Sequence, residues 1–200
     1  MKARNRAGVK KPAAKRVAAR KRVAATKKAV APKNAAKSPA PDNARTFLRH
    51  AVATLAYRCG KATRGAPASF ADFKAGPTTR TPIEILAHIG DLLDWALSQA
   101  EGKERWLDAT RLAWDREVER FHAALKAFDM YLVSRKTLHK PAERMFQGAI
   151  ADSLAHTGQL TLLRRLAGSH VRGENYSRAD IRIGRVGAKQ SPPPERSEFD

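Results

Sequence analysis

The sequence predicts an all-α protein, a four-helix bundle, and two observations carry that prediction. From residue 44 onward, apolar residues recur at alternating spacings of four and three, the pattern of helices that bury one face. Between these segments, no stretch alternates apolar and polar residues as a half-buried strand does. We expect four amphipathic helices to pack together over residues 43–168. A disordered basic tail, residues 1–42, is expected before them and an irregular C-terminal extension, residues 169–200, after them.

The first two predicted helices are separated by a loop rich in glycine and proline, near residues 64–80. The second helix has a defined start, because Thr81 can cap it, Pro82 suits its first turn and Glu84 can reach back to the cap. The core face of the first helix is predicted to contain Leu48, Val52, Leu55, Cys59 and Ala62. The core face of the second contains Ile85, Leu86, Ile89, Leu92, Leu93 and Ala96.

The third predicted helix runs from about Asp108 to Val133. The fourth begins at Pro141 and closes at Gly168, a residue suited to the left-handed turn past a helix end. The core positions of the third helix are predicted to be Trp114, Val118, Phe121, Leu125, Phe128 and Leu132.

Polar residues interrupt the predicted core face of the fourth helix. Its four-three row reads Met145, Ala149, Asp152, His156, Gln159, Leu163 and Leu166. We call the three central residues, Asp152, His156 and Gln159, the polar row. A buried carboxylate or imidazole is costly unless it is paired or binds a metal, so these residues are expected to have a partner.

That partner is predicted to be a metal ion. Asp152 and His156 are four residues apart and face the same way, and His88, among apolar residues of the second helix, offers another imidazole. These three ligands would leave coordination positions open on zinc, nickel, iron or manganese. Asp91 or Gln159 is expected to orient a ligand. Two simpler interpretations stay open: His88 as a hydrogen-bonded core histidine, and an Asp152–His156 ion pair without metal.

The other histidines have no partner at ligand spacing. His50 and His122 lie in charged helical surroundings, and His139 and His170 lie near predicted helix ends. We predict that all four are surface residues.

Two segments carry a resemblance to a known family: Leu86-Ala87-His88-Ile89-Gly90-Asp91, and Ala155-His156-Thr157-Gly158-Gln159-Leu160 with its continuation to Gly168. Over roughly residues 44–168 the chain resembles the DinB-like four-helix bundles, which are also grouped with YfiT-like metal-dependent hydrolases. The resemblance implies metal ligands at His88 and His156, and a hydrolase or thiol transferase acting on a small molecule. The family usually has histidine where this chain has Asp152, a carboxylate that can also bind these metals.

The positive charge is concentrated before the helices. The formal net charge is +20, and residues 1–42 hold 14 of the Lys and Arg residues, a single acid and no aromatic residue. Such a segment cannot build a core, and its composition resembles the tails of linker-histone-like and nucleoid-associated proteins. It favours nonspecific contact with nucleic-acid phosphates, without base stacking. A solvated extension and an organelle transit peptide are the other interpretations.

The single cysteine, Cys59, excludes an internal disulfide and a cysteine-based zinc site within one chain. No run of 18 apolar residues and no secretory signal is evident, so a cytoplasmic or nucleoid-associated protein without a membrane partner is expected. Two classes of function remain. One is a metal-binding bundle acting on a small molecule, and the other is a DNA-binding protein with the bundle as a structural or homodimerising body.

Overall fold

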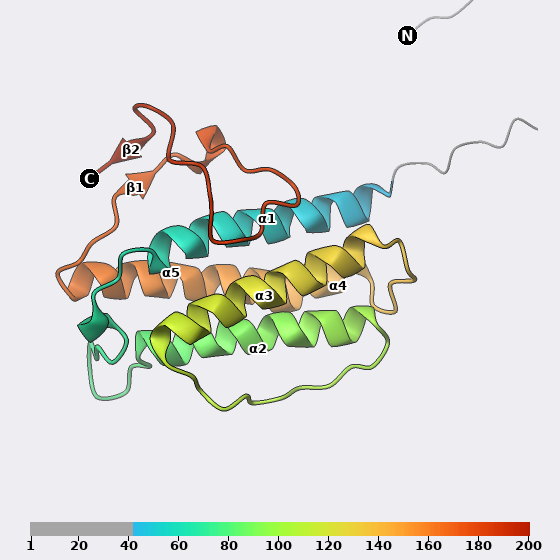
Figure 1. Ribbon diagram of the computed structural model, residues 1–200, viewed down its shortest axis with the longest axis horizontal. Helices are drawn as coiled ribbons and strands as arrows, with labels where there is room; N and C mark the ends of the chain where they lie inside the picture. The colour runs from blue at the N-terminus through green and yellow to red at the C-terminus, as the bar shows by residue number, and fades with distance from the viewer. Residues whose placement is uncertain (1–41) are drawn as a thin grey trace, which may run out of the picture. The chain divides into compact units, whose positions relative to one another are not determined.

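The computed structural model describes residues 42–200, which belong to one compact unit, Ala40–Asp200. This part of the chain is mostly helical and has one small two-stranded sheet (Figure 1). The predicted disordered tail lies outside the described residues, except for Asp42. The Asp42 side chain accepts a hydrogen bond from the backbone N–H of Arg45 and so caps the first helix.

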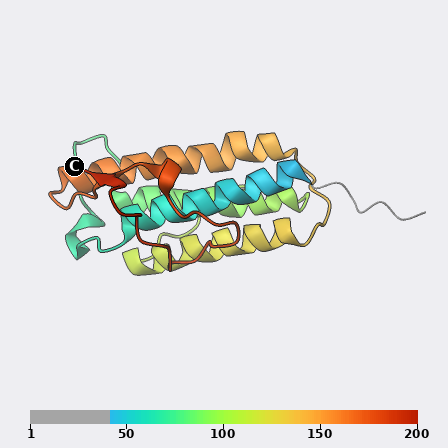
Figure 2. The same ribbon diagram turned by 90° about the horizontal axis from the view of Figure 1, so that it is seen from above.

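Four long helical segments lie side by side (Figures 1 and 2). They are α1, Asn43–Thr63; α2, Pro82–Ala100; α3, Trp114–Val133; and a continuous segment made of α4, Ala142–Met145, a π-helical turn η2, Phe146–Ile150, and α5, Ala151–Leu166. Helix α2 packs against α3 and α5, and α1 packs against the other sides of α3 and α5. The site-bearing helices α2 and α5 are therefore direct neighbours.

The predicted core faces of the first two helices are confirmed. Every core residue predicted for α1 and α2 is buried, and all of them belong to one continuous hydrophobic core. In α3 the predicted face is buried from Phe121 to Leu132, while Trp114 and Val118 are half-buried and pack against its edge. The 3.6-residue period therefore located the core correctly in α1, in α2 and in α3 from Phe121 onward.

The predicted helix ends around α2 and α5 are also confirmed. Thr81 and Glu84 form a reciprocal capping box: the Thr81 N–H donates to the Glu84 carboxylate at 2.8 Å, and the Glu84 N–H donates to Thr81 Oγ1 at 3.4 Å. Gly168, just past the end of α5, has a φ of +73°, the left-handed conformation expected there.

Helix α3 begins at Trp114, later than the predicted start at Asp108. Residues 101–113 form an extended connection instead, and Leu107 and Leu112 are exposed on it. The Leu112 N–H donates to the buried Glu117 carboxylate at 2.7 Å, which holds the chain at the helix entrance. With no apolar period of its own, this segment has no buried face that would favour a helix.

The prediction that the polar row is part of a buried face is wrong. Downstream of η2 the core positions of α5 are Ser153, Thr157, Leu160, Leu163 and Arg164, while Asp152 and Leu166 are exposed. A π turn holds more residues than an α turn and so rotates the following helix relative to a constant 3.6-residue period. The hydroxyls of Ser153 and Thr157 tolerate burial because each donates to the carbonyl four residues earlier.

The C-terminal extension lies along the outer side of α1 (Figures 1 and 2). It contains a short antiparallel pair, β1, Gly173–Glu174, and β2, Glu198–Phe199, and a single 3₁₀ turn, η3, Tyr176–Arg178. The buried Glu174 carboxylate accepts from Tyr57 Oη and from Lys61 Nζ, both at 2.7 Å. These bonds fasten the extension to α1.

Within residues 42–200, none of the helices is both long and apolar enough to cross a lipid bilayer.

Candidate metal centre

The structure brings the three predicted metal ligands together. His88 lies in the second turn of α2, and Asp152 and His156 lie in the first two turns of α5, on the side that faces α2. One ligand atom from each residue lies within 4.8 Å of the other two. His88 thus lies close to Asp152 and His156, which follow it by 64 or more positions in sequence, because α2 and α5 pack against each other.

The spacing of these atoms suits a small divalent ion. Asp152 Oδ2 lies 3.8 Å from His88 Nε2, and Asp152 Oδ1 lies 3.5 Å from His156 Nε2. In a tetrahedral zinc site with bonds of about 2.05 Å, ligand atoms are about 3.3 Å apart, so the three side chains, whose ligand atoms lie within 4.8 Å of one another, would move closer together around an ion. Both separations lie within ion-pair distance but exceed the usual length of a hydrogen bond, so an Asp152–His156 ion pair without metal fits the same geometry.

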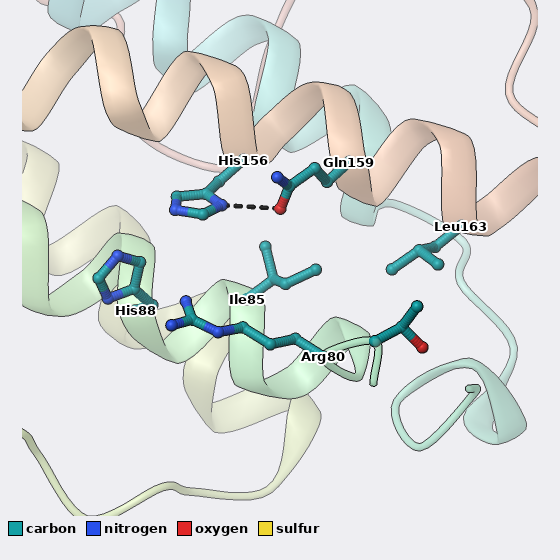
Figure 3. Close-up of a pocket in the computed structure, with 7 residues that line it drawn as sticks. Arg80, Ile85, His88, His156, Gln159 and Leu163 are labelled. Atoms are coloured by element: carbon teal, nitrogen blue, oxygen red, sulfur yellow. Dashed lines mark hydrogen bonds between the residues drawn. The ribbon is translucent and has the colours of Figure 1, made fainter. Parts of the chain in front are cut away.

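A third member of the polar row holds one of these ligands. The Nδ1 atom of His156 lies 2.8 Å from Oε1 of Gln159 (Figure 3). An amide oxygen only accepts, so this hydrogen bond forms when Nδ1 carries the proton, which leaves the lone pair on Nε2, the atom near Asp152. Such a contact would orient His156, the role predicted for Gln159.

Asp91, the other predicted orienting residue, has a different partner. Its carboxylate accepts a hydrogen bond from Arg120 of α3, which also pairs with Asp94 at 2.9 Å. Asp91 therefore contributes to an ion-pair network between α2 and α3. Its influence on His88 is electrostatic, through its negative charge.

The surroundings of His88 favour its neutral imidazole. Burial lowers the pKa of His88 below its ordinary value, and electrostatic interactions with His156 and Arg80 act in the same direction, while Asp152 and Asp91 oppose the shift. Its ring packs against Trp106 with the ring centroids 5.6 Å apart, and it meets His156 edge-on at 4.9 Å. A neutral imidazole is the form that binds a metal, so this environment favours coordination.

A cavity of about 460 Å³ opens beside the two imidazoles (Figure 3). Its lining consists of Thr79, Arg80, Ile85, His88, His156, Gln159 and Leu163. The exposed fraction is 24% for the His88 side chain, 13% for His156 and 48% for Asp152, so the cluster is accessible from this cavity and from solvent. A ligand in the cavity would lie next to the metal-binding atoms, which suits a catalytic site better than a closed structural one.

The predicted surface positions of three other histidines are confirmed, because His50, His139 and His170 are exposed. His122 was predicted wrongly. It is half-buried beneath the C-terminal extension, and its Nδ1 lies 3.0 Å from the carbonyl oxygen of Val186. The charged neighbours of His122 in sequence gave no sign that a distant segment covers it.

Two residues of the site were not foreseen from the sequence. Arg80 was assigned only to a loop, and Trp106 lies in the connection where no contact with His88 was expected. Neither position is periodic with the core, so only the path of the chain around α2 reveals them.

A scan of the sequence against protein-family models found no match, and searches of curated proteins and of solved structures found none either. The assignment of this site therefore depends on its geometry and on the chemistry of its residues.

Proposed function

We propose that this chain is a divalent-metal-binding four-helix bundle of the DinB-like type, which acts on a small molecule held in the cavity beside the metal. The observation that carries the proposal is the convergence of His88, Asp152 and His156 within 4.8 Å at the edge of that cavity. The carboxylate makes zinc, nickel, iron and manganese all suitable ions.

The donor set supports a reactive centre in preference to a structural one. Three protein ligands leave at least one coordination position free, and the cavity provides room for a substrate at that position. A bound divalent ion would supply an activated water or thiolate at neutral pH. The proposed reactions are hydrolysis of a small ester or amide, or transfer of a thiol to a small electrophile.

The chain's own residues would perform the positioning. Gln159 fixes the ring and tautomer of His156, and Trp106 covers one side of His88. Ile85 and Leu163 give the cavity an apolar wall that limits water near the reacting atoms.

The reaction is tested by incubating the metal-loaded full-length protein with panels of activated esters, amides and thiol–electrophile pairs. We expect turnover by the parent protein and none by His88→Ala. The control is His50→Ala, which changes an exposed histidine away from the cavity and should leave turnover unaffected. Turnover that persists in His88→Ala at the parental rate would contradict a reaction at this site.

A second function is proposed for residues 1–42 on the charge of that segment, which has 14 basic residues and one acid. It would bind nucleic acid nonspecifically and place the protein on DNA in the cytoplasm. If all of these cations contact phosphates, log Kd against log salt has a slope of up to about 12. Deleting residues 1–42 is expected to abolish duplex binding in a salt titration. Unchanged affinity of the truncated protein would rule this function out.

A further inference from the structure

Arg80 places a positive charge in the cavity without a neighbouring acid. Its side chain extends along α2 toward His88 (Figure 3), close enough for its charge to act on that imidazole. Among residues 42–200, no carboxylate lies within ion-pair distance of Arg80. The acid nearest to it in sequence, Glu84, is engaged by Arg111 at 2.8 Å and by the Thr81 cap.

The rest of the lining divides into donors and apolar surface. Gln159 uses its amide oxygen on His156, so its NH₂ group remains available beside the cavity. The facing wall is formed by Ile85 and Leu163, whose residues are 3% and 6% exposed. The cavity thus combines one guanidinium and one amide donor with an apolar surface, which suits a ligand with an anionic head and a hydrocarbon body.

The charge of the whole site favours an anionic ligand. A divalent ion held by two neutral imidazoles and the Asp152 carboxylate keeps a net positive charge, and Arg80 adds another. A guanidinium binds a carboxylate through two parallel hydrogen bonds.

We propose that the cavity binds a small organic monocarboxylate, whose carboxylate pairs with Arg80 and whose carbon chain packs against Ile85 and Leu163. This inference rests on the proposed function, because it names the substrate class of that same site. Arg80 is then the residue that selects acids over neutral molecules of the same shape.

The experiment uses the full-length protein loaded with zinc and saturation-transfer NMR. The probes are straight-chain and branched monocarboxylates of four to eight carbons, benzoate, and the matched neutral amides. The carboxylates are expected to bind and the amides not to bind. Arg80→Gln should weaken carboxylate binding about tenfold or more, because it removes a charge-assisted pair. Arg80→Lys should give an intermediate loss of carboxylate affinity, since lysine keeps the charge but cannot form the two parallel hydrogen bonds of a guanidinium.

The control is Arg116→Gln, which removes an exposed arginine away from the cavity and should leave binding unchanged. The inference is overturned if no carboxylate binds, if amides bind as well as acids, or if Arg80→Gln binds as tightly as the parent. Zinc content is measured in every sample. A zinc-bound protein that does not bind carboxylates would overturn this inference alone. Carboxylate binding through Arg80 in a protein that takes up none of zinc, nickel, iron or manganese would overturn the metal proposal alone.

Discussion

Gln159 holds the imidazole of His156, its amide oxygen lying 2.8 Å from Nδ1. The contact joins two residues three positions apart on α5, of which Gln159 is exposed and the His156 side chain is 13% exposed. A fixed ring with its lone pair on Nε2 is preorganised for a metal, and outer groups of this kind typically change metal affinity by about 10- to 100-fold.

Gln159→Leu is therefore expected to weaken zinc binding by about 10- to 100-fold without unfolding the protein, because it removes the hydrogen bond but no metal ligand. Competition against a chromophoric chelator measures the affinity. Gln147→Leu, an exposed glutamine outside the cavity lining, is the matched control and should match the parent. Equal affinity of both variants would show that Gln159 does not orient a ligand.

Asp152→His should preserve or raise the affinity for zinc and nickel, because it supplies a third imidazole at the same position on α5. Asp152→Ala should lower the affinity, since it deletes one ligand. Isothermal titration of both variants gives the comparison. Loss of metal binding in Asp152→His to the level of Asp152→Ala would place Asp152 in another role.

Trp106 is expected to report metal binding by fluorescence, since its ring centroid is 5.6 Å from that of His88 and open-shell ions quench nearby indoles. Addition of cobalt or nickel should quench the parent protein. Trp106→Phe should lose most of that quenching while it binds the same amount of metal, and Trp114→Phe, which contacts Phe70 instead, should retain it. Full quenching in Trp106→Phe would indicate that the ion binds elsewhere.

His122 is expected to make stability depend on pH. Burial lowers its pKa in the folded protein, while the unfolded chain has a value of about 6.5, so the unfolded state binds more protons as the pH falls. The folded state should lose stability below about pH 6.5, by at most about 1.4 kcal/mol per pH unit and by less because the ring is partly exposed.

The control for this prediction is His122→Asn, whose amide N–H can replace the bond to the Val186 carbonyl without titrating. Thermal unfolding at pH 7.5 and 5.5 should show a smaller difference in this variant than in the parent. His50→Asn, at an exposed position, should behave like the parent. The same pH dependence in all three proteins would assign it to other groups.

The sequence correctly predicted those features of the helices that a local sequence pattern determines. The capping pattern of Thr81 and Glu84 placed the start of α2 correctly, and a regular apolar period identified the buried faces of α1 and α2. The π turn η2 has no such signal, so the polar row was expected in the core and lies instead at the edge of a cavity. The three predicted residues still converge, because Asp152 and His156 face α2, which carries His88.

The rest of the site depends on contacts between distant segments. Trp106 contacts His88 only because the extended connection, residues 101–113, runs back along α2. The composition of this segment does not specify that path. Arg80 and His122 likewise owe their environments to neighbours far away in sequence. Local periodicity cannot encode such contacts.

The central claim is that His88, Asp152 and His156 bind one divalent ion. It is tested most directly by elemental analysis of the purified protein, made without a polyhistidine tag, beside His156→Ala and the control His50→Ala. We predict close to one equivalent of zinc, nickel, iron or manganese in the parent and in His50→Ala, and none in a folded His156→Ala. No metal in the parent after reconstitution with each ion, or a full equivalent in His156→Ala, would contradict the claim.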